Sequence, residues 1–243
     1  MRSTAIHERS LPDATEPHET RANSVLRPIV FGANDGLVSN LALVMGVAGA
    51  TSQTGIIILA GVAGLIAGAF SMGVGEYISV QSQRELLDYQ IAFQRKQLRE
   101  VPDQERRILA GIYTERGFSD EEAQQFVDAV FDEPEHAVRL LIFEEVGLDV
   151  RSIGSPLAAA VGSFIAFTAG AFVPLLPYLL ISGMPAFVGS LVVSLLALAL
   201  LGTGIAALTR RPAWYGATRQ VLLGSVAAAV TYAVGILVGV GAG

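Results

Sequence analysis

Five long apolar stretches, almost free of charged residues, limit this chain to a small set of folds. They occupy Pro28–Ala50, Ile56–Val80, Pro156–Ile181, Ala186–Leu208 and Gln220–Val240. A helix of about 20 apolar residues is long enough to cross the hydrocarbon core of a bilayer, which is roughly 30 Å thick. Backbone groups in lipid need internal hydrogen bonds, so such stretches are expected to be helices. The sequence therefore predicts an all-α membrane protein with five transmembrane helices.

The basic residues predict how these helices cross the membrane. All 16 of them fall before the first stretch, between the second and third, or between the fourth and fifth: Arg2, Arg9, Arg21, Arg27; Arg84, Arg95, Lys96, Arg99, Arg106, Arg107, Arg116, Arg139, Arg151; Arg210, Arg211, Arg219. With five crossings, these three segments share one side of the membrane. The positive-inside rule assigns that side to the cytoplasm, so the N-terminus is predicted inside and Gly243 outside.

The segment 81–155, between the second and third helices, carries most of the charge and is predicted to be a small helical cytoplasmic domain. Ser119 and Glu122 have the spacing of a capping box at the start of a helix. Helices are expected over Arg84–Arg99, Asp103–Arg116, Asp120–Phe131 and from Pro134 to near Gly147. The predicted organisation is a disordered cytoplasmic tail at 1–26, two transmembrane helices in 27–80, the insert at 81–155, and three transmembrane helices in 156–243.

Composition excludes several classes of function. The chain has no cysteine, so disulfides and thiolate metal sites are excluded. Basic residues form no stripe suited to nucleic acid. A G-x-x-x-x-G-K-[ST] phosphate-binding motif is absent, and no catalytic constellation occurs. The sequence thus gives no indication of an enzyme.

Asp35 and Glu76 are the only acids inside the apolar stretches, and they are the first candidate site residues. An ionised carboxylate in the hydrocarbon core costs several kcal/mol unless a cation or proton compensates it. Met72 lies one helical turn before Glu76, and Met45 lies deeper in the first stretch. Carboxylate and thioether ligands together suit Fe²⁺ or Mn²⁺ better than Ca²⁺, which prefers oxygen alone.

Each of these residues also has a purely structural interpretation. Glu76 precedes Tyr77 and Gln81, which suit the headgroup boundary, so it can be interfacial. Met72 and Met45 are residues that commonly fill gaps in cores. Gly64 and Gly68, on the Met72 face, form a small-residue stripe for close helix packing or dimerisation without any role in transport.

Two longer motifs give a resemblance to a known family. They are Gly32-Ala-Asn-Asp-Gly-Leu-Val-Ser39 and Ala67-Gly-Ala-Phe-Ser-Met-Gly-Val-Gly-Glu-Tyr-Ile-Ser-Val-Gln-Ser-Gln-Arg84. Both closely resemble the vacuolar iron transporter family, which includes the yeast vacuolar iron/manganese transporter and bacterial members. The resemblance extends over nearly the whole chain after Leu26, and this chain is similar to the bacterial type.

The resemblance implies a homodimeric carrier that moves Fe²⁺ or Mn²⁺ out of the cytosol in exchange for protons. Its ion path is thought to lie at the dimer interface, and the residues that match it here are Asp35, Met72 and Glu76. No permanently bound cofactor is implied, because the metal ion is the transported substrate. The implied location is the plasma (inner) membrane of a bacterium, with the lipid bilayer and a second copy of the chain as partners.

The insert departs from the family pattern. In the plant member this region loads metal through several glutamates and a methionine. Only Glu105 and Glu145 keep their acids here, while the other positions carry Gln94, Gln97, Ile108 and Leu141. Glu144, Glu100 and Asp103 are nearby acids that could substitute. Two carboxylates and two amides form a poor site for such a dication, so the insert is expected to keep its helical shape with weaker metal loading. Two more family acids are replaced by Pro28 and Gly64.

The sequence thus predicts a carrier that exports or sequesters Fe²⁺ or Mn²⁺. One alternative is a carrier of another cation on the same fold. Another is a membrane-anchored dimeric binding or sensor protein that acts through its helical insert.

Overall fold

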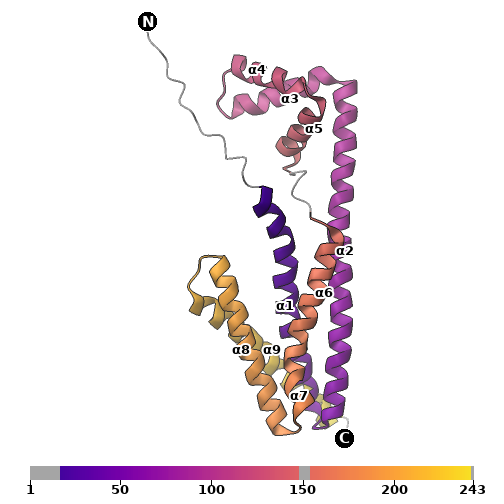
Figure 1. Ribbon diagram of the computed structural model, residues 1–243, viewed down its shortest axis with the longest axis vertical. Helices are drawn as coiled ribbons and strands as arrows, with labels where there is room; N and C mark the ends of the chain where they lie inside the picture. Colours follow the sequence, from indigo (N-terminus) through magenta and orange to yellow (C-terminus); the bar gives the residue numbers. More distant parts are fainter. Residues whose placement is uncertain (1–16, 148–153, 242–243) are drawn as a thin grey trace. The chain divides into compact units, whose positions relative to one another are not determined.

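The structure is a computed structural model that describes residues 17–147 and 154–241. The described residues are helical and contain no strand. They divide into two compact units. The apolar unit holds the described residues of 25–79 and 155–243, and the insert unit holds those of 80–154 together with the described residues before Val25. Figure 1 shows the helices of both units.

The described residues contain five helical segments long and apolar enough to cross a membrane, as predicted. The first two belong to α1 (Pro17–Ala50) and α2 (Thr54–Glu100). Helix α1 begins before the predicted start at Pro28, which lies inside it, so residues 17–26 are not a coil. The predicted disorder of residues 1–16 lies outside the described residues. Helix α2 continues without a break into the insert unit, as the charged helix over Arg84–Arg99 was expected to do.

The third apolar stretch is broken near its end. It consists of α6 (Pro156–Phe172), a 3-10 turn η2 (Val173–Leu175) and α7 (Leu176–Leu180). Pro174 and Pro177 explain the break, because proline lacks an N–H and clashes with the preceding turn of a helix. The hydroxyl of Ser190 donates a 2.6 Å hydrogen bond to the carbonyl oxygen of Pro174. This buried bond ties η2 to the next helix, α8 (Met184–Leu208).

The last helix, α9 (Ala213–Gly241), begins earlier than the predicted Gln220. The link between α8 and α9 therefore contains only residues 209–212, although the charges at Arg210–Arg219 suggested a longer loop. Pro212 precedes the first helical residue, where its missing N–H costs no helical hydrogen bond.

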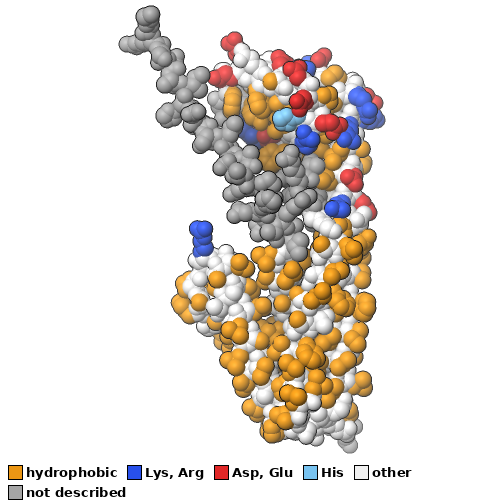
Figure 2. Space-filling view, viewed as in Figure 1, with side chains coloured by type: hydrophobic (Ala, Val, Ile, Leu, Met, Phe, Trp, Pro, Cys, Tyr) orange, Lys and Arg blue, Asp and Glu red, His pale blue; other side chains and the backbone are white. Residues whose placement is uncertain are grey.

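The apolar unit has a core made from α1, α2 and the three C-terminal segments. Its most buried members are at most 1% exposed and include Leu41, Val44, Met45, Leu175 and Leu198. Glycines allow the helix backbones to approach: Gly32 and Gly36 of α1 face α6, and Gly235 of α9 faces Gly46. Figure 2 shows apolar side chains covering the visible surface of this unit, as expected for helices surrounded by lipid.

The insert unit is a small helical bundle with its own core. It contains α3 (Pro102–Glu115), α4 (Asp120–Phe131), α5 (Pro134–Leu141) and a π-helical turn η1 (Ile142–Val146). The predicted capping box is present: Ser119 accepts from the Glu122 backbone N–H, and the Glu122 carboxylate accepts from the Ser119 N–H at 3.0 Å. The core contains Leu109, Val127 and Leu141, all fully buried.

Candidate functional site

A cavity of about 340 Å³ lies in the apolar unit among α1, α2, α8 and α9. Polar side chains from three of these helices reach it, together with three apolar ones. The lining residues are Arg27, Val30, Phe31, Asn34, Glu76, Ile205 and Gln220. At about 30 Å³ per water molecule, a shell of six waters needs roughly 180 Å³. The cavity is therefore large enough for a divalent ion with its first hydration shell.

Polar groups of this cavity lack partners among the described residues. Oδ1 of Asn34 is buried and accepts no hydrogen bond from the described residues. Gln220 is only 6% exposed, yet it lines the cavity. Within the described segments, neither Arg27 nor Glu76 forms an ion pair. Because buried polar groups normally find partners, these oxygens are available for water or a bound cation.

The other predicted transmembrane site residues lie elsewhere. Asp35 is half-buried and is not among the cavity residues. Phe31 and Ser39, one turn before and after it on the same face of α1, are exposed. Met72 packs against a cluster formed by Ala69, Phe167 and Ala171.

Met45 and the glycine stripe have packing roles within this chain. Met45 is 1% exposed in the apolar core. A Cβ atom added to Gly64 would meet Leu43 and Asn40 of α1, and one added to Gly68 would meet the ring of Phe167. The stripe therefore allows close packing against α1 and α6, while its predicted part in dimerisation stays a prediction.

In the insert unit, Glu145 contacts Gln94 and lies close enough to Glu105 for its charge to act on that carboxyl. The amide Nε2 of Gln94 donates a 2.6 Å hydrogen bond to Oε2 of Glu145. Glu105 is 5% exposed, and both its Oε2 and the Oε1 of Gln94 lack partners among the described residues. Burial raises the pKa of Glu105 above its usual value, and the negative charge of Glu145 raises this pKa further. The pair is a poor metal site as it stands, because it supplies only two carboxylates and one of them already accepts the Gln94 hydrogen bond.

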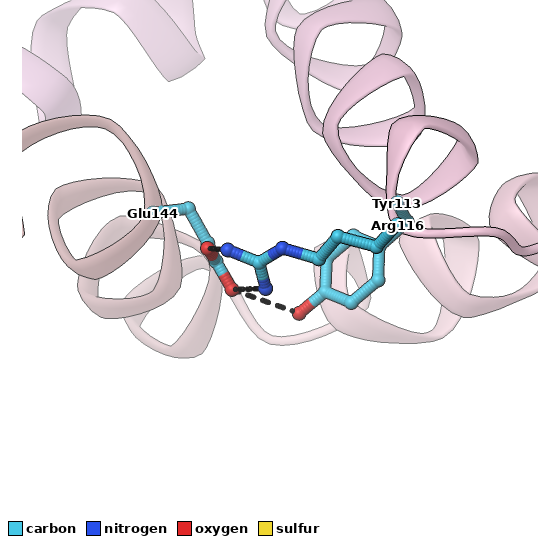
Figure 3. A network of polar contacts seen from close by, with 3 residues as sticks. All are labelled: Tyr113, Arg116 and Glu144. Atoms are coloured by element: carbon cyan, nitrogen blue, oxygen red, sulfur yellow. Dashed lines mark hydrogen bonds and ion pairs between the residues drawn. The ribbon is translucent and has the colours of Figure 1, made fainter.

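Glu144 is held by basic and phenolic groups. Its carboxylate is 3% exposed, forms an ion pair with the guanidinium of Arg116 and accepts a 3.2 Å hydrogen bond from the hydroxyl of Tyr113 (Figure 3). Burial and the adjacent Glu144 raise the pKa of Tyr113. Glu100 lies 3.9 Å from the ammonium of Lys96 on the solvent-exposed end of α2. Neither acid joins Glu105 and Glu145.

These positions explain why the structure does not assemble a metal cluster from acids alone. Across residues 17–147 and 154–241, no three His, Asp or Glu side chains are placed so that they could hold a metal ion together. Sequence reasoning missed Gln220 as a cavity residue. Asn34 appeared there only as part of the first family motif, without a role of its own. Asn40 was also missed: its Nδ2 donates a 2.5 Å hydrogen bond to the carbonyl oxygen of Ala171.

Comparison with known proteins supports the resemblance carried by the two motifs. The profile described as "VIT family" matches residues 26–236. A protein named vacuolar iron transporter 1 from Arabidopsis thaliana is 32% identical over 219 residues, covering 90% of this chain and 87% of the relative. One named vacuolar iron transporter from Acanthamoeba castellanii is 35% identical over 213 residues, covering 87% and 78%.

A third relative, named vacuolar iron transporter 2, from Oryza sativa subsp. japonica, is 30% identical over 223 residues, covering 91% of this chain and 90% of the relative. The matched region includes the five apolar helices, the insert, Asp35, Met72 and the cavity. The extent of these matches shows that the chain belongs to the VIT family.

Proposed function

We propose that this protein carries Fe²⁺ or Mn²⁺ across the membrane and out of the cytoplasm. Its relatives are named as iron transporters. The observation that carries the proposal is the cavity, because it presents the Glu76 carboxylate and the unpartnered Asn34 oxygen between apolar helices, with Arg27 as the other charged residue of its lining. A carboxylate placed among apolar helices without a partner is costly, and a bound cation compensates that cost.

Each site residue then has a distinct role. Glu76, Asn34 and Gln220 receive the ion while it keeps part of its water. Asp35 and Met72 bind it further along, with oxygen and sulfur ligands that suit Fe²⁺ and Mn²⁺. Proton exchange follows if a carboxylate takes up a proton after the metal leaves. Met45 has no part in this path, because its side chain is enclosed in the apolar core.

The position of Asp35 supports a homodimer. The carboxylate lies on a face of α1 whose neighbours Phe31 and Ser39 are exposed in the single chain. A half-buried carboxylate beside exposed positions is unfavourable in lipid, so a second protein surface would stabilise it by covering this face. A second copy of α1 brings another Asp35 to the same place. Two carboxylates are a suitable charge for one divalent ion.

The insert unit has a lesser role in this proposal. We propose a cytoplasmic location for it in a bacterial inner-membrane protein with its N-terminus inside, and the positive-inside rule applied to its basic residues supports this sidedness. Glu144 is already paired with the guanidinium of Arg116, and Glu145 already accepts a hydrogen bond from Gln94. Weak metal binding by the insert is therefore expected, and transport should depend on the apolar unit.

Metal uptake into proteoliposomes tests the proposal. Fe²⁺ and Mn²⁺ are compared with and without a pH gradient, for the unaltered chain and for Glu76→Gln and Asp35→Asn. Each variant removes a charge at nearly constant volume, so uptake should fall at least about tenfold, equivalent to about 1.4 kcal/mol. Met45→Leu is the control, because a volume-conserving core change should leave uptake unchanged.

Two results would contradict the proposal. Absence of uptake of either metal, with the protein folded, would favour a membrane-anchored binding or sensor protein acting through the insert. Equal uptake by all variants would remove Glu76 and Asp35 from the path. Uptake that does not change with the pH gradient would be consistent with a metal carrier but would contradict proton exchange.

A further inference from the structure

The turn between α8 and α9 contains an arginine in a backbone conformation that favours glycine. Arg210 has a φ of 52°, and it is the only non-glycine residue with positive φ in the described part of the chain. The N–H of Arg211 bonds to the Ala206 carbonyl at 2.9 Å, and that of Arg210 bonds to the Ala207 carbonyl at 3.3 Å. These two bonds form a Schellman motif, whose left-handed position is usually occupied by glycine.

Elsewhere the chain follows the usual preference. The other described positions with positive φ are all glycines: Gly117, Gly147 and Gly183. A side chain with a Cβ atom is disfavoured in this conformation. Arginine at position 210 is therefore not explained by the backbone, and its charged group needs another reason to be there.

The charge around the turn is not neutralised by the protein. Arg210 and Arg211 are exposed, and Arg219 follows within two turns of α9. Residues 155–243 contain no acid, and within the described residues none of these arginines forms an ion pair. Figure 2 shows basic side chains at the end of α8, beyond the apolar surface of the unit.

Aromatic side chains lie beside these arginines. Trp214 is 70% exposed and Tyr215 is 48% exposed, with ring centroids 6.2 Å apart in an edge-to-face arrangement. The guanidinium of Arg219 lies 5.9 Å from the centre of the Tyr215 ring. Exposed tryptophan and tyrosine at the end of an apolar helix are typical of the headgroup layer. Leu208, 61% exposed at the end of α8, supplies an apolar neighbour for the acyl chains.

We propose that this turn binds the headgroup of an anionic phospholipid, with Arg210 and Arg211 on the phosphate and Trp214 at the glycerol level. Guanidinium groups bind phosphate through paired hydrogen bonds, which suits a headgroup better than a single ammonium would. The partner is a lipid and not a soluble anion, because the same turn presents apolar and aromatic side chains next to the charges. This interaction does not depend on the proposed transport activity.

Trp214 is the only tryptophan in the sequence, so its fluorescence reports on this turn alone. The full-length protein is reconstituted in phosphatidylcholine vesicles that contain a small fraction of acyl-brominated phosphatidylglycerol or acyl-brominated phosphatidylcholine. Brominated phosphatidylglycerol should quench Trp214 more strongly at the same fraction. Loss of one arginine should weaken this preference about fivefold, a typical effect of one basic residue near an anionic surface.

The variant Arg210→Gly distinguishes a role of Arg210 in lipid binding from a role in terminating α8. Glycine suits the left-handed conformation, so this variant should fold with an equal or higher unfolding temperature and still lose anionic preference. Arg210→Lys keeps the charge and should keep most of the preference. Inorganic phosphate at millimolar concentration should not restore Trp214 to its unquenched emission.

Three results would overturn the proposal. Equal quenching by both brominated lipids in the unaltered protein would show that the turn has no headgroup preference. An unchanged lipid preference in Arg210→Gly and in Arg211→Ala would mean that these arginines do not bind the headgroup and interact only with the dipole at the C-terminal end of α8. Displacement by free phosphate would assign the site to a soluble anion.

Discussion

Replacing Gly36 with alanine should separate α1 from α6. An added Cβ atom would clash with the carbonyl oxygen of Phe167, and it would lie 2.9 Å from the carbonyl carbon of Phe167 and 3.0 Å from the backbone nitrogen of Ala171. Favourable contacts lie at about 3.5–4.0 Å, and the oxygen is the nearest of these atoms, so the two helices must move apart by about 1 Å or more. The obstacle is backbone, which no rotamer change can remove. One turn further along, the 2.5 Å hydrogen bond from Asn40 to Ala171 would also lengthen.

The expected loss of stability follows from two opposing effects. Overpacking costs about 1–3 kcal/mol. Alanine in place of glycine favours a helix by about 1 kcal/mol. The obstacle at Gly36 is backbone, so the overpacking cost should lie in the upper part of its range, at about 2–3 kcal/mol. The net loss of about 1–2 kcal/mol should lower the thermal midpoint in detergent by several degrees, at roughly 2–4 °C per kcal/mol.

The control is Gly204→Ala in α8. Gly204 is exposed and has no atom within 4 Å of an added Cβ, so only the gain in helix propensity remains. Its thermal midpoint should stay constant or rise. If both variants shift the midpoint in the same direction, the close approach of α1 and α6 at Gly36 is wrong.

Three further changes test other parts of the structure. Gly68→Ala should destabilise the apolar unit, because the added Cβ atom meets the side-chain ring of Phe167. Adding Phe167→Leu to the same chain should recover part of the lost stability. Thermal midpoints of the single and double variants measure the coupling between the two positions. Ser119→Ala should lower the protection of α4 amides by about 1 kcal/mol in hydrogen exchange of the full chain, because it removes the cap. Burial raises the pKa of Glu105, so its contribution to stability is complete below the ordinary value of 4.5 and is lost as pH rises through the folded pKa. Glu105→Gln should therefore make the protection of α3 less dependent on pH above 4.5, after correction for intrinsic exchange.

Features that depend on neighbouring residues could be predicted from the sequence. The five spans follow from hydropathy and length, and the structure confirms them. The capping box at Ser119 requires only a residue three positions later, and both of its hydrogen bonds are present. The start of α9 was placed too late because charge at Arg219 suggested a loop, although a charged side chain is compatible with a helix that extends beyond the hydrocarbon core.

Features that depend on distant residues could not be predicted. The cavity requires the facing sides of α1, α2, α8 and α9, so Gln220 gave no local signal. Glu144 looked available for metal because its partner Arg116 lies 28 positions away. Met45 looked like a ligand because its burial within the core depends on Leu175 and Leu198, from other helices.

The two acids of the apolar unit differ in what surrounds them, and this difference bears on how an ion can cross. The amide nitrogen of Asn40 and the hydroxyl of Ser190 donate hydrogen bonds to backbone carbonyls of neighbouring segments. Glu76 instead reaches a cavity large enough for water within a single chain. Asp35 is not among the residues that line this cavity, and Ser39, one turn further along the same face of α1, is exposed in the single chain. In the proposed homodimer, Glu76 would bind an ion within one protomer, whereas Asp35 would need the second protein surface. A change that keeps the chain monomeric is therefore predicted to abolish transport before it abolishes metal binding at Glu76.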